Sequence, residues 1–304
     1  MNLLDRRLLI VGGKGGTGKS LVAASLAELA SFRGKKVLLI SADDSPGAAG
    51  LFGVEPEHDP IEVARNLHVL RIESEQSLLE FVKLQLGALG AVAGPVARAF
   101  NFVADAAPGV SELLLVGKYA HEARTGDWDL VVVDAASSGH LLGELAAPEN
   151  VREIAPVGRL ARETGWIIAL LADEEATGVV NVTLAEEVPV SETLEFVDRL
   201  HAGTPANLAA VVVNRTRPQL YAKSKREAID ELIENPPARL SQGAAGLLDG
   251  VLIGLERADV ASAIDARLRS ELPAGTDIIH VPELGIVPDM RAAVREAIAD
   301  ELSL

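Results

Sequence analysis

Residues 11–20 read VGGKGGTGKS, and this glycine-rich stretch restricts the possible folds more than any other part of the chain. An apolar run, LLIV at 8–11, leads directly into it, and a helix-like segment, SLVAASLAELASFRG, begins at Ser20 and ends at Gly34. The apolar run is typical of a buried strand, and a closing glycine is typical of a helix end. The sequence therefore predicts a strand, a tight glycine loop and a helix in direct succession.

The loop fits the spacing G-x-x-x-x-G-K-[ST] at Gly13, Gly18, Lys19 and Ser20. Glycines let successive backbone N–H groups curl around phosphate oxygens at the positive end of the following helix. We expect Lys19 to reach the β- and γ-phosphates of a nucleotide and the Ser20 hydroxyl to bind Mg2+. A glycine-rich turn that binds nothing is the alternative, and the strand and helix on either side disfavour it. The predicted nucleotide-binding residues of the loop are Gly13, Lys14, Gly15, Gly16, Thr17, Gly18, Lys19 and Ser20.

Short runs rich in leucine and β-branched residues recur along the chain and predict the remaining strands. Because the runs are continuously apolar, both faces of their sheet should be covered by helices, as in a parallel sheet. WIIALLAD at 166–173 fits a strand or a helix, and we interpret it as a helix because a strand-like run follows closely. The prediction is one doubly wound, mostly parallel α/β domain over 1–304, with a helical insertion at about 73–124. The predicted strands are LLIV (8–11), VLLI (37–40), HVLRI (68–72), LVVVD (130–134), VVNVTL (179–184), AAVVVN (209–214) and IIHV (278–281).

Composition narrows the possible functions. The formal net charge is −16, so binding to nucleic acid is not expected without a local basic surface. The chain has no cysteine, which excludes a disulfide framework, a thiolate zinc site and a cysteine nucleophile. The longest uncharged stretch, at 84–97, is shorter than the about 20 residues that a membrane-spanning helix needs. Because the N-terminal apolar run leads into the loop rather than forming a signal segment, we expect a cytoplasmic protein.

Lys14 is a second lysine that a phosphate loop does not itself require. The segment KGGTGKS at 14–20 resembles the deviant Walker A loop, K-G-G-x-G-K-[ST]. The resemblance implies that Lys14 crosses a dimer interface and contacts the nucleotide of the partner. It would then stabilise the charge that develops during phosphoryl transfer, as an arginine finger does. A solvated lysine on an exposed loop is the alternative.

Two further segments resemble the ArsA and tail-anchored-protein-targeting ATPases of this class. LLISADDSPGAAGLFG at 38–53 is similar to their switch I segment, which implies that Asp43 orients the attacking water. DLVVVDAASSGHLLGELAAPENV at 129–151 is similar to switch II, which implies that Asp134 holds Mg2+ through water. His140 matches a family position, but we assign it no catalytic role. The resemblance thus implies an ATPase with ATP and Mg2+ as ligands and with Lys14, Lys19 and Asp43 as catalytic residues.

The base end of the nucleotide is expected in the second half of the chain. VTLAEEVPVSETLEFVDRL at 182–200 is similar to a family segment that places Glu186 near the nucleotide. VVVNRTRP at 211–218 places Asn214 on the family's adenine-reading asparagine, whose amide can donate and accept at once. HVPELGIVP at 280–288 resembles the last base-contacting loop, with Pro282 against the base.

Both switch segments depart from the family pattern. Asp44-Ser45-Pro46 follows Asp43 where the family has Pro-Ala-His, and residues 135–138 read AASS where the family has Thr-Ala-Pro-Thr. A second carboxylate beside Asp43 adds like charge near phosphate, which can slow hydrolysis or merely face solvent. The chain also lacks the cysteines that bind arsenite or zinc in the family, so neither metal function transfers. It has only two methionines, which disfavours a methionine-rich client groove.

The leading hypothesis is an ATPase that hydrolyses ATP at a dimer interface and thereby changes its affinity for a protein or membrane-protein client. The dimer is either a homodimer or a heterodimer with a paralogue, and the altered switches make a weakly hydrolysing heterodimer subunit a serious option. The apolar stretch Leu84–Ala97 is a possible client surface, although core packing is the simpler interpretation. A positioning ATPase like MinD or ParA is an alternative, but the C-terminal stripe of Val294, Ile298 and Leu302 suits core packing better than a membrane surface. A scaffold that holds ATP without turnover is a third possibility.

Overall fold

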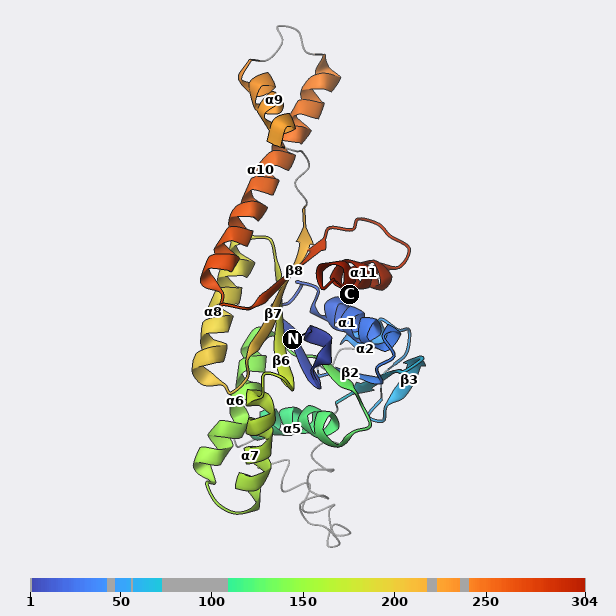
Figure 1. Cartoon of the computed structure of the whole chain (residues 1–304), viewed down its shortest axis with the longest axis vertical. Helices are drawn as coiled ribbons and strands as arrows, with labels where there is room; N and C mark the ends of the chain where they lie inside the picture. Colours follow the sequence, from blue (N-terminus) through green and yellow to red (C-terminus); the bar gives the residue numbers. More distant parts are fainter. Residues whose placement is uncertain are drawn as a thin grey trace.

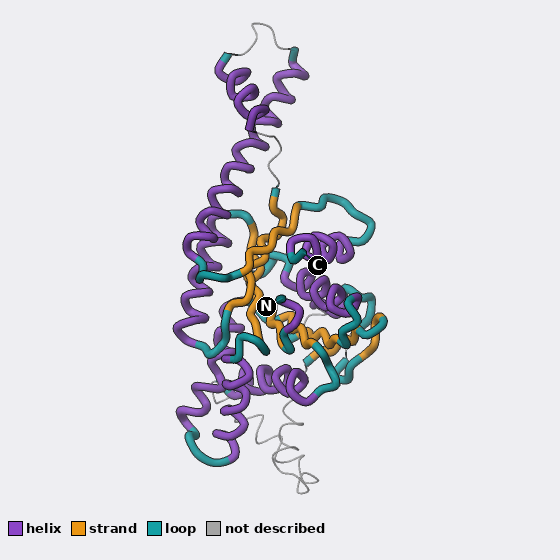
Figure 2. The backbone as a smooth tube through the Cα atoms, viewed as in Figure 1, coloured by secondary structure: helices purple, strands orange, loops and turns teal. Residues whose placement is uncertain are grey.

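The structure is a computed structural model that describes residues 2–42, 47–55, 57–72, 109–217, 223–235 and 241–303. Strands form the centre of the molecule, with helices around them (Figure 2). They make one eight-stranded sheet in the order β3-β4-β2-β5-β1-β6-β7-β8, and every pairing is parallel except that of β3 with β4. The expected doubly wound α/β fold is therefore confirmed. The strands are β1 (Leu8–Gly13), β2 (Val37–Ser41), β3 (Ile61–Ala64), β4 (Leu67–Arg71), β5 (Leu130–Asp134), β6 (Thr177–Leu184), β7 (Leu208–Thr216) and β8 (Asp277–Pro282).

The central strands are buried on both faces. Along β1, Leu8 and Ile10 enter one apolar cluster and Leu9 and Val11 enter the other, as the alternation of side chains along a strand requires. All seven strands expected from the sequence are present. The antiparallel edge strand β3 was not predicted, because IEVA is short and its side chains are half-buried or exposed.

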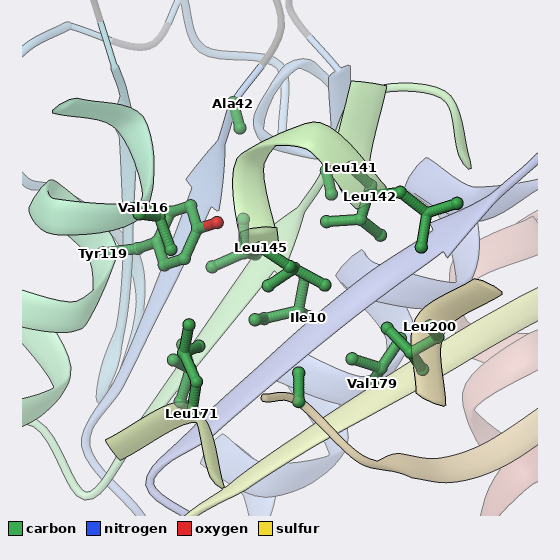
Figure 3. Packing of buried hydrophobic residues seen from close by; sticks show 14 of the residues in the cluster. Ile10, Ala42, Val116, Tyr119, Leu141, Leu142, Leu145, Leu171, Val179 and Leu200 are labelled. Atoms are coloured by element: carbon green, nitrogen blue, oxygen red, sulfur yellow. The ribbon is translucent and has the colours of Figure 1, made fainter. Parts of the chain in front are cut away.

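Helices cover the two faces of the sheet (Figure 1). One face carries the helices that pack on the cluster of Leu9 and Val11, which are η1 (Leu3–Asp5), α1 (Lys19–Phe32), α2 (Gly47–Gly50) and α11 (Met290–Glu301). The other face carries α5 (Val110–Thr125), α6 (Ser138–Ile154), α7 (Arg159–Ala172) and α8 (Glu187–Gly203), with the last turns of α10. Figure 3 shows this second core, in which Tyr119 from α5, Leu145 from α6 and Leu171 from α7 lie around Ile10.

Several predictions about single helices are confirmed. The ambiguous run at 166–173 forms the end of α7 and is a helix. The C-terminal stripe is core, because Val294 and Ile298 of α11 are buried and Leu302 packs against the same cluster. Among the described helices, none is long and apolar enough to cross a lipid bilayer.

Between β7 and β8 the chain forms a helical arm, which consists of α9 (Lys223–Glu234) and the first half of α10 (Gln242–Glu271). The arm rises away from the sheet at the end of the molecule opposite α7 (Figure 1). Arg226 of α9 donates two hydrogen bonds to Asp259 of α10, at 2.7 and 2.6 Å. The second half of α10 returns along α8 and buries Ile264 and Leu268 in the core.

The insertion expected at 73–124 falls largely outside the described residues, as does all of the apolar stretch Leu84–Ala97. Its described end belongs to α5, and five buried residues of that helix are part of the core: Leu113, Val116, Tyr119, Ala120 and Ala123. The boundaries of the insertion stay a prediction.

Candidate functional site

The phosphate loop runs from the carboxyl end of β1 to the first turn of α1. Gly13 has φ 140°, and a Cβ at this position would lie 2.3 Å from the Val182 carbonyl oxygen of the neighbouring strand β6. Gly18 has φ 97° and directly precedes α1. As the N-cap residue, Gly18 has no side chain that could accept a hydrogen bond from the first backbone N–H groups of α1. This arrangement suits a phosphate group, which the N-terminus of a helix attracts.

Within the loop, Lys19 and Ser20 open α1 and are half-buried, whereas Lys14, Gly15 and Gly16 are exposed. Thr17 is buried and closes the turn, because its hydroxyl donates to the Lys14 carbonyl oxygen at 2.8 Å. The Thr17 carbonyl in turn accepts a hydrogen bond of 2.8 Å from the side chain of Asn214, at the end of β7. The hydrogen bonds donated by the Thr17 hydroxyl and the Asn214 side chain therefore stabilise the conformation of the loop.

Lys14 lies apart from the other loop lysine. Its side chain is 60% exposed, and its ammonium forms an ion pair with Glu192 of α8. Beside this pair is a cavity of about 270 Å³ between the loop, the start of α6 and α8, and its polar lining includes Lys14, Ser137, Ser138, Glu192, Glu195 and Arg199. Glu192 could not be predicted as the partner of Lys14, since 178 positions separate the two residues along the chain.

Asp134 ends β5 next to β1, as expected, and it is 5% exposed. One of its carboxylate oxygens accepts a hydrogen bond of 2.8 Å from the backbone N–H of Ala48, at the start of α2. Gly47 makes this approach possible, because a Cβ there would lie 2.9 Å from the same oxygen. The sequence did not predict this contact, which joins the switch II carboxylate to the short helix α2 within the switch I segment.

The oxygen groups of Asp134 and Ser20 fit Mg2+. A carboxylate and a hydroxyl are hard ligands of the kind that Mg2+ prefers, and the ion usually keeps several waters and phosphate oxygens in its shell. In the described part of the chain no three acidic or histidine side chains gather in a way that could hold a metal ion by themselves. Asp43, the predicted water-orienting residue, lies outside the described residues.

The residues expected at the base end lie in two adjoining pockets. Glu186, at the N-cap of α8, and Asn214 line a pocket of about 630 Å³. Pro282, at the end of β8, lines a second pocket of about 450 Å³. The two pockets share Ala185, Arg217 and Ala261 as walls.

Two features of these pockets were missed by sequence analysis. The helix α10 supplies one wall through residues that include Arg257, Val260 and Ala261. Arg217 donates a hydrogen bond of 2.6 Å to Glu283, which lowers the pKa of that carboxyl. Arg217 follows Asn214 closely in the same quoted segment and could have been noticed, but no local signal places α10 beside the strand ends.

Comparison with known proteins agrees with this geometry. The profile of the anion-transporting ATPase family, ArsA, matches residues 6–165, which include the loop, both switches and β5. ATPase BagA of Mycobacterium tuberculosis is 31% identical over 297 residues, covering 91% of this chain and 86% of BagA. An arsenical pump-driving ATPase of Aquifex aeolicus is 25% identical over 245 residues, covering 70% of this chain and 81% of that protein. ATPase GET3 of Mycosarcoma maydis is 30% identical over 170 residues, covering 54% of this chain and 50% of GET3. The chain therefore belongs to the ArsA family of anion-transporting ATPases and is an ATPase.

Proposed function

We propose that this ATPase hydrolyses ATP at an interface between two chains and uses the nucleotide state to change its affinity for a protein or membrane-protein client. The observation that carries the proposal is the position of Lys14. Its side chain is 60% exposed and pairs with α8, while Lys19 of the same loop lies half-buried at the start of α1. A lysine in this position is available to a nucleotide on a second chain.

In the proposed mechanism the residues of the site have separate roles. The N–H groups at the start of α1 and the Lys19 ammonium bind the phosphates, and Asp43 orients the attacking water by a hydrogen bond. Ser20 and, through water, Asp134 would hold a Mg2+ ion, which would neutralise charge on the phosphates. Lys14 of the other chain then adds a positive charge where negative charge develops during the transfer.

The relatives support a client-handling role in general terms, because they include proteins named GET3 and an arsenical pump-driving ATPase. The net charge of −16 argues against nucleic acid as the partner. A heterodimer with a paralogue remains the second candidate, and the altered switch residues Asp44 and Ala135–Ser138 favour it.

The test combines light scattering with phosphate release, with and without ATP and Mg2+. We expect the wild-type chain to dimerise with ATP and to hydrolyse it. Lys14→Ala should still bind ATP but hydrolyse it about 10³-fold more slowly, which is the lower end of the effect of removing an arginine finger. A wild-type chain that binds ATP yet stays monomeric and inactive would overturn the homodimer and direct the search to a paralogous partner. A Lys14→Ala variant with unchanged turnover would contradict the role of Lys14.

A further inference from the structure

The short helix α2 is attached to the ends of two neighbouring strands. Ser41 ends β2 and Asp134 ends β5, and the two residues are directly paired in the parallel register of these strands. Oδ2 of Asp134 accepts a hydrogen bond of 2.8 Å from the backbone N–H of Ala48. The hydroxyl oxygen of Ser41 accepts the next N–H, that of Ala49, at 3.3 Å. Ala48 and Ala49 are completely buried, so these two bonds fix α2 against the strand ends.

Gly47, directly before these two N–H groups, allows this close approach. Its φ is 49°, in the left-handed region that favours glycine. A Cβ at this position would lie 2.9 Å from Oδ2 of Asp134 and 3.0 Å from the hydroxyl oxygen of Ser41. A larger residue at this position would therefore have to displace the carboxylate or the helix.

We infer that Gly47 is a positioning residue for the Asp134 carboxylate, and that α2 thereby sets the affinity of the nucleotide site for Mg2+. The hydrogen bond from Ala48 goes to an ionisable, buried acceptor, and bonds of this kind are stronger than those between neutral groups. It restricts rotation of the carboxylate and so orients both of its oxygens. Accurate orientation matters because Mg2+ demands a nearly ideal octahedral shell, and groups that support such a shell affect metal affinity. The inference rests on the proposed role of Asp134 in holding the ion through water, and not on dimerisation.

The test separates binding of Mg2+ from binding of nucleotide. Binding of ADP is measured by calorimetry in EDTA and at a series of Mg2+ concentrations for wild type, Gly47→Ala and Asp134→Asn. Gly53→Ala is the matched control, because Gly53 also has a positive φ, of 73°, but a Cβ there has no neighbouring atom within 4 Å. It therefore introduces similar backbone strain without disturbing the carboxylate. Thermal unfolding without ligand shows whether each variant is folded, and Ser41→Ala, which removes the second acceptor of α2, supplies the result if Gly47→Ala does not fold.

We expect Gly47→Ala to lower the Mg2+ affinity of the ADP complex by about tenfold, the lower end of the effect of removing an outer-shell partner, and to leave ADP affinity in EDTA unchanged. Ser41→Ala should show the same pattern with a smaller loss, and Gly53→Ala should show no loss.

Three results would overturn the inference. If Asp134→Asn lowers the Mg2+ affinity but Gly47→Ala and Ser41→Ala do not, α2 does not position the carboxylate, although the proposed role of Asp134 stands. If Asp134→Asn also leaves the Mg2+ affinity unchanged, the proposed role of Asp134 is itself wrong. An equal loss in Gly53→Ala, or an equal loss of ADP affinity in EDTA, would assign the effect to backbone strain or to nucleotide binding in general.

Discussion

At the scale of single residues, the two loop lysines differ because of where the backbone places them. Lys19 follows Gly18 into α1, so its side chain starts at the positive end of a helix, beside the expected phosphates. Lys14 precedes the turn that Thr17 closes, and it is held by Glu192 from α8. In the proposed dimer, Glu192 therefore competes with the partner's nucleotide for Lys14.

Replacing Glu192 with glutamine should release Lys14. We expect Glu192→Gln to lower the protein concentration that gives half-maximal turnover, by at most about fivefold, because an exposed ion pair contributes no more than about 1 kcal/mol. Turnover as a function of protein concentration measures this effect. Glu195→Gln is the control, since Glu195 lies on the same helix and lines the same cavity. Lower turnover in Glu192→Gln would instead mean that Glu192 supports catalysis.

The features of the site that depend on neighbouring residues in the sequence were predicted, whereas contacts between residues far apart in the sequence were not. The loop residues and Asp134 were placed correctly at strand ends, because their signals are local: a glycine pattern and a carboxylate directly after an apolar run. The contacts of Lys14 with Glu192 and of Asn214 with Thr17 join residues 178 and 197 positions apart. No local pattern carries such information, so neither the pairing of Lys14 with Glu192 nor the hydrogen bond from Asn214 to Thr17 was predicted. The role expected of Asn214 came from the family resemblance alone.

At the scale of elements, the strands were predicted well because burial on both faces leaves continuous apolar runs. The edge strand β3 and the helix α10 were missed. In β3, no side chain is fully buried. In α10, the first half lies in an exposed arm with Leu247 and Ile253 largely in solvent, so its apolar residues do not form the usual one-sided stripe. The glycines at 243, 246, 250 and 254 also weaken the helical signal.

The arm provides a prediction about an element. Asp259→Asn should loosen α9 from α10, because it replaces the carboxylate that accepts two hydrogen bonds from Arg226. We expect faster hydrogen exchange of the α9 amides, with the core strands and ATP turnover unchanged. Asp249→Asn, on the exposed surface of the same helix, is the control. Unchanged exchange in α9 would show that apolar contacts alone hold the arm together.

The same pair has a defined pH dependence. The hydrogen bond from Arg226 lowers the pKa of Asp259, so the pair is complete at neutral pH and is lost only as the pH falls through that lowered value. After division by the intrinsic exchange rate at each pH, the protection of the α9 amides should therefore be constant around neutrality and fall only in acid.

At the scale of the whole molecule, the strand order explains how distant residues meet. β1 lies between β5 and β6, and β7 lies beside β6. Since these strands are parallel, their carboxyl ends bring together the loop after β1, Asp134 after β5, Glu186 after β6 and Asn214 near the end of β7. Ligands of open α/β sheets bind at this edge, where the chain leaves neighbouring strands in opposite directions. The fold thus brings together, from most of the chain, residues that we propose form the nucleotide site, and we propose that a second chain supplies one further charge.

The most direct test of that proposal mixes two variants that are each inactive alone, Lys14→Ala and Asp43→Asn. In a mixed dimer, the Lys14→Ala chain keeps its own Asp43 and receives Lys14 from the other chain, so one of the two sites is complete. With random pairing, phosphate release should return to about one quarter of the wild-type rate, because half of the dimers are mixed and each has one working site. If the mixture stays as inactive as its components, Lys14 does not act between two copies of this chain, and the central proposal is wrong.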